Sequence, residues 1–375
     1  MTKEIRPLVV GCPREIKEQE NRVALTPPGA AQLARRGVRV LVETRAGRGA
    51  DYDDDEYREA GAEVVDSARA VFEQARLIVK VKEPQPTELA LLEPRHLLFT
   101  YLHLAADRRL TEALVATGCT ALAYETVRVG ERLPLLEPMS EVAGRMSVIV
   151  GAYFLAEHAG GRGVLLGGVP GVLPGRVTIL GGGTCGFNAA RVATGIGAET
   201  TILDIDSERM TWLDMAIPAA RTLYSTEAAL LELLPRTDLL IGAVLLPGAR
   251  APRLITREML RVMRPGTVLV DIAVDQGGCA ETTRATTHAA PTYVEEGVTH
   301  YCVANMPGAY ARTSTQALTS VTLPYLESLA LGGVDGAVER HPELAHGVSC
   351  HAGRLTCEEV ALAHGLEWVP FAPGA

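Results

Sequence analysis

Four polar side chains lie at or just past the ends of apolar, strand-like segments, the place where α/β proteins bind their ligands. Lys82 ends the run LIVKVK and His103 follows LLFTYL, so consecutive strands would carry an ammonium and an imidazole to one rim of a sheet. Asp275 follows the apolar run 268–272, and Arg22 stands in NRVALTP. Histidine moves protons near neutral pH, and arginine pairs with carboxylates. The non-functional alternatives are that His103 is structural, that Asp275 is a turn residue and that Arg22 forms a surface ion pair.

A glycine-rich turn indicates a dinucleotide site. Gly181, Gly183 and Gly186 follow the apolar run 177–180 and open a predicted helix at 187–194. Missing side chains let backbone N–H groups approach a pyrophosphate, whose charge the helix N-terminus favours. The bland alternative is a tight strand-to-helix turn without a ligand.

The choice of dinucleotide depends on Asp204, which ends the next predicted strand about 20 residues after the glycines, where a carboxylate accepts hydrogen bonds from ribose hydroxyls. A 2′-phosphate beside it would be repelled by roughly 1–4 kcal/mol, so the sequence predicts NAD over NADP. Arg209 leaves several alternatives open. It could pair with Asp204, stack on adenine, admit some NADP, or be a solvated helix charge.

The elements that would position these residues follow an α/β rhythm. Beyond residue 176, strands are predicted at 177–180, 200–203, 239–244, 268–272 and 301–304, with a helix at 256–263 capped by Thr256. The first third is predicted to have strands at 38–43, 77–82, 97–102 and 120–124 and helices at 30–36 and 110–117, and a long helix at 142–157 joins the two parts. The predicted fold class is α/β, with two doubly wound domains.

Composition excludes several classes of protein. A chain of 375 residues with 47% hydrophobic side chains is too apolar to be disordered, and its net charge of -9 offers no basic face for nucleic acid. The start does not read as a secretion signal, and the longest apolar stretch, 142–156, is interrupted by Arg145, so we expect no membrane span. Seven cysteines without a Cys-x-x-Cys pair suit a reduced cytoplasmic protein.

Six segments resemble the L-alanine dehydrogenases, in order and over nearly the whole chain. They are NRVALTP (21–27), VKVKEP (79–84), FTYLHLA (99–105), PMSEVAGR (138–145), DIAVDQGG (271–278) and YCVANMP (301–307). The resemblance implies two Rossmann-like domains, with an NAD-binding domain at 135–312 inserted into a substrate domain made of 1–134 and 313–375. It also implies a homohexamer.

Site residues carry over from this resemblance position by position. It implies that Arg22 and Lys82 hold the substrate, that His103 is the acid and base, and that Asp275 is a second catalytic group. The residues implied around NAD are Ser140, Gly181, Gly183, Thr184, Cys185, Gly186, Asp204, Arg209, Ser225, Val244, Leu245, Ile272, Asp275, Arg284, Val303, Asn305 and Met306. Some relatives hold a divalent metal through a Glu and a His after Pro324, where this chain has Ser328 and Gly332, so we predict no metal there.

The resemblance implies an NAD-dependent enzyme of amino-acid catabolism that reversibly converts L-alanine to pyruvate and ammonium. Two alternatives remain open: a related dehydrogenase acting on another short 2-oxo acid, and a nucleotide-binding sensor without turnover. A transhydrogenase subunit, which needs membrane partners, is disfavoured because the chain carries a C-terminal return segment and all four of Arg22, Lys82, His103 and Asp275.

Overall fold

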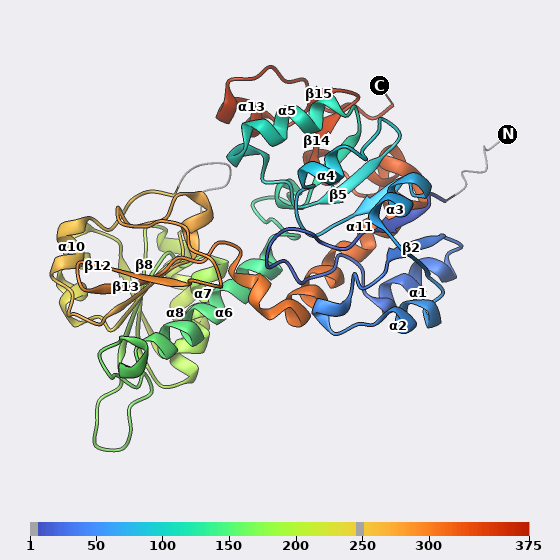
Figure 1. Ribbon diagram of the computed structural model, residues 1–375. Helices are drawn as coiled ribbons and strands as arrows, with labels where there is room; N and C mark the ends of the chain where they lie inside the picture. The colour runs from blue at the N-terminus through green and yellow to red at the C-terminus, as the bar shows by residue number, and fades with distance from the viewer. Residues whose placement is uncertain (1–6, 245–250, 375) are drawn as a thin grey trace. The chain divides into compact units, whose positions relative to one another are not determined.

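The chain divides into two compact units, and the second is inserted into the first. A computed structural model describes residues 7–244 and 251–374 (Figure 1). Unit 1 comprises Met1–Met139 and Gly308–Ala375, and unit 2 comprises Ser140–Pro307. The predicted fold class, two α/β domains with one interrupting the other, is therefore confirmed.

Unit 1 is built on an eight-stranded sheet. The order is β15-β14-β6-β5-β4-β1-β2-β3, and the pairs from β3 to β6 are all parallel. Those six strands follow the doubly wound order 3-2-1-4-5-6, which places ligands beyond the strand ends near the switch between β1 and β4. The strands are β1 (Val10–Cys12), β2 (Val40–Glu43), β3 (Glu63–Val65), β4 (Leu77–Val79), β5 (Leu97–Thr100), β6 (Thr120–Ala123), β14 (Val348–His351) and β15 (Arg354–Leu355).

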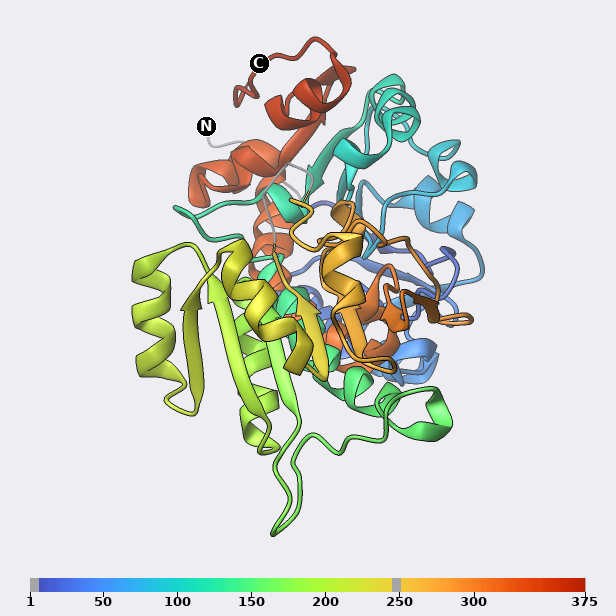
Figure 2. The same cartoon turned by 90° about the vertical axis from the view of Figure 1, so that its left-hand side faces the viewer.

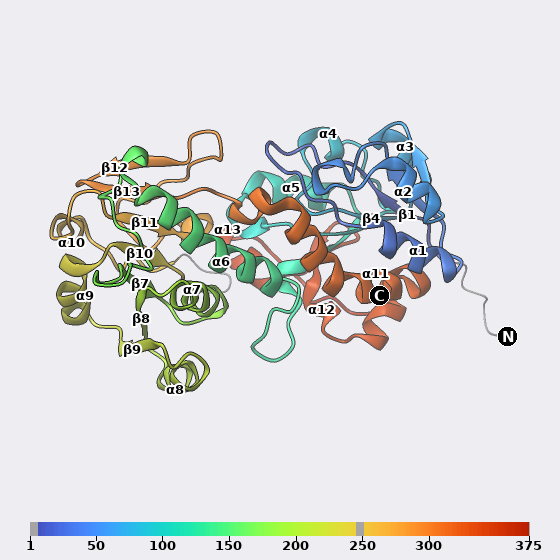
Figure 3. The ribbon, with the colours of Figure 1, turned by 90° about the horizontal axis from the view of Figure 1, so that it is seen from below.

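Alternate residues of these strands enter two cores, one on each face of the sheet. Leu77, Val79 and Phe99 belong to one core, and Ile78 and Leu98 to the other. Helices α1 and α11 cover the first face and α3 and α5 the second (Figure 3). The helices are α1 (Pro27–Arg35), α2 (Asp54–Glu59), α3 (Ala68–Gln74), α4 (Pro86–Leu89), α5 (Arg108–Ala116), α11 (Ala311–Arg340, interrupted at Gly333), α12 (Leu344–Gly347) and α13 (Glu358–His364).

Unit 2 repeats the same topology. Its sheet has the order β12-β13-β11-β10-β7-β8-β9, parallel except for the edge strand β12 (Figure 2). The switch point lies between β7 and β10. The strands are β7 (Arg176–Leu180), β8 (Glu199–Asp204), β9 (Ala220–Tyr224), β10 (Leu239–Gly242), β11 (Val268–Asp271), β12 (Thr292–Glu295) and β13 (Val298–Tyr301).

Two cores again lie on opposite faces of the unit 2 sheet. Ile179 and Ile241 pack with α6 and α7, whereas Leu180 and Leu240 pack with α9 and α10 (Figure 3). The helices are α6 (Glu137–Phe154), α7 (Thr184–Gly195), α8 (Ser207–Ala216), α9 (Glu227–Leu233) and α10 (Arg257–Arg261). Thr256 caps α10 as predicted, since its side chain accepts from the Met259 N–H.

The strand predicted at 301–304 is wrong. The observed strand, β13, runs earlier and ends at Tyr301. It was missed because Thr299 and His300, although buried, are polar and so do not appear in the hydrophobic pattern. The His300 ring is satisfied by Thr282 Oγ1 at 2.7 Å and by the Val298 carbonyl at 2.9 Å. The structure also adds short strands that were not predicted, among them β1, β3 and β9.

Across the part of the chain that the structure describes, no helix is both long and apolar enough to span a bilayer. All seven cysteines lie in the described residues and are free thiols, and all except the half-buried Cys185 are buried.

Candidate active site

Lys82 and His103 meet at the strand-end rim of unit 1. Strands β4 and β5 are parallel neighbours, so their carboxyl ends point to the same edge of the sheet. Both strands stop earlier than predicted, at Val79 and Thr100, which leaves the two side chains on the loops just beyond. Lys82 Nζ lies 3.2 Å from His103 Nε2. The predicted pairing of an ammonium and an imidazole on one rim is thus present.

The surroundings of His103 favour the neutral imidazole. Loss of hydration, together with the charges of Lys82, Lys17 and Arg22, lowers the pKa of His103 well below its usual value. An ammonium only donates, so Nε2 accepts from Lys82 and the ring proton resides on Nδ1. The ring stacks on Tyr101, with centroids 5.8 Å apart and planes 10° apart.

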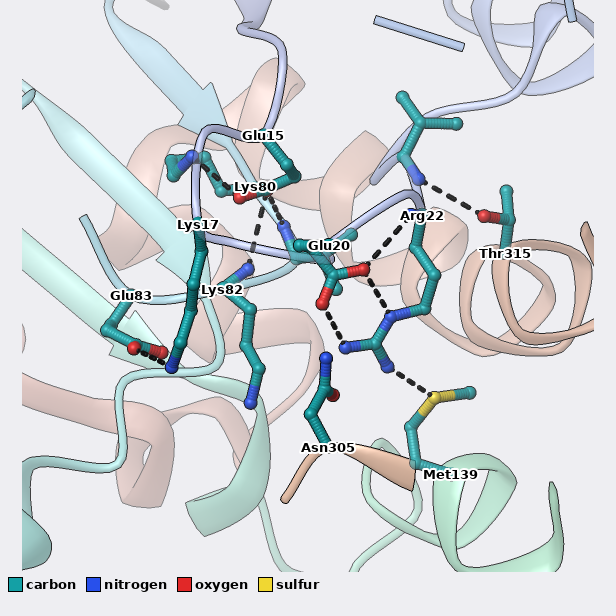
Figure 4. A network of polar contacts seen from close by, with 12 residues as sticks. Glu15, Lys17, Glu20, Arg22, Lys80, Lys82, Glu83, Met139, Asn305 and Thr315 are labelled. Atoms are coloured by element: carbon teal, nitrogen blue, oxygen red, sulfur yellow. Dashed lines mark hydrogen bonds and ion pairs between the residues drawn. The ribbon is translucent and has the colours of Figure 1, made fainter. Parts of the chain in front are cut away.

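Arg22 is a buried cation held by a buried carboxylate. Its Nε and Nη2 donate to Glu20 at 2.7 and 2.5 Å, and its Nη1 contacts the Met139 sulfur at 3.0 Å (Figure 4). Burial alone would lower the pKa of Arg22, but the hydrogen bonds and charge of Glu20 outweigh it and the pKa is raised. The Nη1 edge, where the Met139 thioether is a weak acceptor, can donate to a stronger acceptor such as a carboxylate.

The segment that carries Lys82 is fastened by a buried ion cluster. Glu15 accepts hydrogen bonds from the Val81 N–H at 2.6 Å and the Lys82 N–H at 3.4 Å (Figure 4). Its other oxygen pairs with Lys80 Nζ at 2.9 Å, and Glu88 pairs with the same ammonium at 2.8 Å. Burial lowers the pKa of Lys80, but the two carboxylates more than reverse this. The cluster therefore keeps Lys80 charged and the chain around Lys82 in place.

In unit 2 each glycine of the turn meets a distinct steric demand. Gly181 has φ +93°, in the left-handed region, and a Cβ on Gly186 would lie 1.8 Å from the Gly181 carbonyl oxygen. Gly183 has nothing within 4 Å of its Cβ position and caps the N-terminus of α7. The turn thus leaves open space at the positive end of a helix, which fits the pyrophosphate of a dinucleotide.

Asp204 ends β8 as predicted and is bonded to the glycine turn. One oxygen accepts from the Gly182 N–H at 2.6 Å, and the other accepts from the N–H groups of Ile205 and Asp206. Oδ2, which accepts from the Gly182 N–H, has a further lone pair, so a ribose hydroxyl can still donate to it. Ser225 lies alongside, because its N–H donates to the Asp204 carbonyl at 2.8 Å.

Arg209 contacts the glycine turn and a neighbouring aromatic ring, and its predicted roles toward adenine and NADP stay predictions. Its Nε donates to the Gly182 carbonyl at 2.7 Å, and its guanidinium lies 4.2 Å from the centre of the Trp212 ring. Arg209 and Asp204 thus bind the carbonyl and the N–H of the same residue, Gly182. Burial lowers the pKa of Arg209, and the charge of Asp204 opposes that shift.

Asp275 lies in a single-turn segment, Ile272–Gln276, directly after β11. Its side chain is exposed, and Oδ2 is 3.5 Å from the Asn305 amide nitrogen, which brings two predicted cofactor residues together. Asp271 anchors the segment by accepting from the N–H groups of Ala273 and Cys279, at 3.0 and 2.8 Å. Burial raises the pKa of Asp271.

The other predicted cofactor residues lie nearby in unit 2. Ser140 contacts the Cys185 thiol, whose pKa burial raises to about 11, and Val244 is within 3.2 Å of where a Gly181 Cβ would be. The Arg284 guanidinium lies 3.8 Å from the centre of the Tyr293 ring. Leu245 is outside the described residues. Of the remaining predicted residues, Thr184 begins α7 and Ile272 directly follows β11. Val303 lies just past β13, and Met306 begins the single-turn segment Met306–Tyr310.

Sequence reasoning missed the carboxylates that hold the site, namely Glu15, Glu20 and Glu125. Glu125 follows β6 on the same rim as Lys82 and His103, so the strand-end rule, applied to one more strand, would have found it. Glu15 and Glu20 follow β1, which is only three residues long and was not predicted. The signal for these two was therefore hidden.

Ser328 and Gly332 both lie on α11, and their side chains offer neither a carboxylate nor an imidazole. Among the described residues, no cluster of three or more His, Cys, Asp or Glu is arranged to hold a metal. The absence of a metal at this position stays a prediction.

These features define a two-unit α/β protein in which one unit carries a dinucleotide turn and the other a Lys, His and Arg cluster. The family models for the alanine dehydrogenase/PNT N-terminal and C-terminal domains match residues 11–143 and 147–358. The chain therefore belongs to the alanine dehydrogenase/PNT family.

Individual relatives lead to the same family. An alanine dehydrogenase from Halomonas elongata is 53% identical over 365 residues, covering 97% of this chain and 98% of its own. A solved L-alanine dehydrogenase is 50% identical, with a TM-score of 0.92 over 96% of this chain and 99% of its own. A transhydrogenase from Sinorhizobium meliloti is more distant, at 25% identity and a TM-score of 0.79 over 93% of this chain and 99% of its own.

Proposed function

We propose that this protein is an NAD-dependent L-alanine dehydrogenase, which reversibly converts L-alanine, NAD⁺ and water to pyruvate, ammonium and NADH. The observation that carries the proposal is the contact of 3.2 Å between Lys82 and His103 in a chain that matches alanine dehydrogenases over nearly its full length. The lower similarity to the transhydrogenase favours the soluble dehydrogenase reaction over a membrane-coupled one.

In this proposal Arg22 binds the substrate carboxylate. The guanidinium is buried and aligned by Glu20, so little side-chain freedom is lost when the carboxylate displaces the Met139 sulfur from the Nη1 edge. Glu20 also neutralises much of the charge of Arg22, so Lys82 contributes the remaining positive charge near the substrate. Lys82 then polarises the carbonyl oxygen of pyruvate.

His103 moves the proton. A neutral imidazole can take a proton from water as it attacks the imine carbon, and the resulting imidazolium can return the proton to the departing ammonia. The nearby ammonium of Lys82 disfavours the imidazolium, so His103 is a weak base that gives the proton back readily. We assign the orientation of the water or ammonia to Asp275.

NAD is the cofactor, and when bound it would supply the acceptor for the hydride removed from alanine. The residues present fit this group, because the space at Gly183 and the N–H groups of α7 suit a pyrophosphate and Asp204 suits an unphosphorylated ribose. We assign the remaining predicted cofactor residues to the same ligand.

A coupled set of assays tests the function. Purified protein is mixed with NADH, ammonium and a panel of 2-oxo acids, and NADH absorbance is followed. Rapid oxidation with pyruvate is expected. A larger kcat/KM for another short 2-oxo acid would favour the alternative dehydrogenase, and NADH binding without oxidation of any substrate would favour a sensor.

We further propose that the protein is a homohexamer that works in the cytoplasm in amino-acid catabolism. The free thiols agree with a reducing compartment. Self-association is supported by a loop at 160–175 that extends away from the rest of its unit (Figures 1 and 2) and exposes the apolar side chains of Leu165, Val169, Val172 and Leu173.

A further inference from the structure

A third strand end on the unit 1 rim carries a carboxylate that the proposed reaction does not yet use. Glu125 lies in a single-turn segment, Tyr124–Thr126, directly after β6, which is the parallel neighbour of β5. Its Oε1 accepts hydrogen bonds from the His103 N–H at 2.6 Å and the Leu102 N–H at 3.1 Å. The carboxylate thus binds the backbone N–H of His103, the same residue whose ring moves the proton in the proposed reaction.

His103 has a backbone conformation that needs such support. Its φ of 51° and ψ of 34° are left-handed, a region that is sterically unfavourable for a residue with a Cβ. Successive N–H groups near a left-handed residue converge and form a concavity for an anion. The Glu125 carboxylate occupies that position between the N–H groups of Leu102 and His103. It therefore stabilises the one conformation that the backbone would otherwise leave.

That conformation sets where the imidazole points, because φ and ψ fix the direction of the Cα–Cβ bond. From this backbone the ring lies parallel to Tyr101, whose hydroxyl donates to the Leu135 carbonyl at 2.6 Å, and presents Nε2 to Lys82. Burial raises the pKa of Glu125, and the hydrogen bonds from the His103 and Leu102 N–H groups and the positive charge of Lys82 oppose that rise.

We propose that Glu125 is a positioning residue of the reaction assigned above: its carboxylate holds the left-handed backbone that aims His103, and its negative charge attracts the Lys82 ammonium. This inference rests on the proposed function. Glu125 touches neither substrate nor cofactor in this scheme and acts only through His103 and Lys82.

Two conservative variants separate the tether from the charge. Glu125→Asp keeps the charge but shortens the side chain by about 1.5 Å, so the bond to the His103 N–H is lost. Glu125→Gln keeps an oxygen that can accept from the His103 N–H but removes the charge. The matched controls are Asp54→Ala and Asp54→Asn. Asp54 Oδ1 accepts from the Arg45 N–H at 2.7 Å, and Arg45 is also left-handed, at φ 63°, but has no place in the proposed site.

The two variants should fail in different ways. For Glu125→Asp we expect kcat to fall by about 10–100-fold, because a displacement near 1 Å can cost that much, with a smaller change in pyruvate KM. For Glu125→Gln we expect a smaller loss of kcat and an alkaline limb of the pH profile that moves to lower pH, since an ammonium without its anion deprotonates more easily. Both should bind NADH with a Kd within about twofold of the parent. The Asp54 variants should lower Tm and leave kcat and the pH profile unchanged.

A merely structural role for Glu125 would give a different pattern. If both Glu125 variants lowered Tm but kept the kcat and pH profile of the Asp54 controls, the inference would be overturned. Absence of pyruvate turnover in the parent protein would instead overturn the proposed function. In that case the hydrogen bond between Glu125 and the His103 N–H is tested by the NMR signal of isotope-labelled His103. The signal should shift in Glu125→Asp and not in Asp54→Ala. An unshifted signal in Glu125→Asp would overturn the positioning role as well.

Discussion

At the scale of single residues, the candidate site is held together by pairs of opposite charges. Arg22, Lys82 and Lys80 are cations in protein surroundings, and the structure pairs the first with Glu20 and the last with Glu15 and Glu88. Lys82 contacts the His103 imidazole, whose pKa is lowered. The consequence is a rim where one ammonium and one neutral base face the same substrate.

Replacing the base should abolish most turnover without emptying the nucleotide site. For His103→Ala we expect kcat with pyruvate to fall by about 10²–10⁴-fold, the usual contribution of a positioned acid or base, with an unchanged Kd for NADH. Stopped-flow or steady-state assays and fluorescence titration measure the two quantities. Turnover within a few fold of the parent would show that another group moves the proton.

The pH dependence of alanine oxidation should report the depressed pKa of His103. The neutral ring is the active form in this direction, so kcat/KM should fall only as pH drops through a pKa that lies below the usual 6.5. Removing a neighbouring positive charge raises this pKa, so in Lys17→Met the acid limb should shift to higher pH. If the limb stays in place in that variant, it belongs to a group other than His103.

At the scale of elements, both sites depend on the ends of parallel strands. In unit 1, β4, β5 and β6 bring Lys82, His103 and Glu125 to one edge. In unit 2, β7 leads through the glycine turn into α7, and β8 delivers Asp204 to the same turn. A defect in the contact between strand and helix should therefore appear as a loss of nucleotide affinity.

The turn can be tested with two glycines of one helix. Gly186→Ala places a Cβ where only 1.8 Å separates it from the Gly181 carbonyl, so α7 must move away from β7 and we expect the Kd for NADH to rise at least about 10-fold. Gly195→Ala is the control, because its Cβ meets nothing within 4 Å and alanine favours a helix by up to about 1 kcal/mol. Calorimetric titration and thermal melts measure both. Equal affinity in the two variants would mean that the close strand-to-helix contact is not needed for binding.

At the scale of the whole molecule, the exposed loop at 160–175 bears on assembly. Leu173 is 82% exposed and Leu165 69% exposed, a large apolar area for a surface loop. If this loop packs against other copies of the chain in the proposed hexamer, placing a charge on it should weaken the assembly, since an unpaired charge is costly to bury.

The variant Leu173→Glu tests this point. We expect light scattering to show a smaller particle than the parent, and a concentration-dependent one. Leu362→Glu is the control, because Leu362 is 74% exposed on α13 in the other unit and should leave the mass unchanged. An unaltered mass for Leu173→Glu would place the subunit contacts on another surface.

The sequence alone determined the α/β class, the dinucleotide turn and the acidic residue of β8, and it predicted which residues would carry the chemistry. These features are local: a glycine pattern, an apolar run and the polar residue after it each occupy a short stretch of chain. Two strands were not predicted correctly. Strand β1 has only three residues, which is too few to show a periodic pattern. In β13 the buried Thr299 and His300 resemble surface residues until hydrogen-bond partners such as Thr282 are known.

Only the tertiary structure decided how the reactive groups are held. Glu20 and Glu15 could be read as surface charges, yet one aligns Arg22 and the other fixes the segment of Lys82. Glu125 lies 22 residues from His103 and reaches it because β5 and β6 are neighbours in the sheet. Such contacts depend on the order of the strands in the sheet and on burial. Burial removes water and so strengthens the interaction between charges. Neither property can be read from the spacing of residues along the chain.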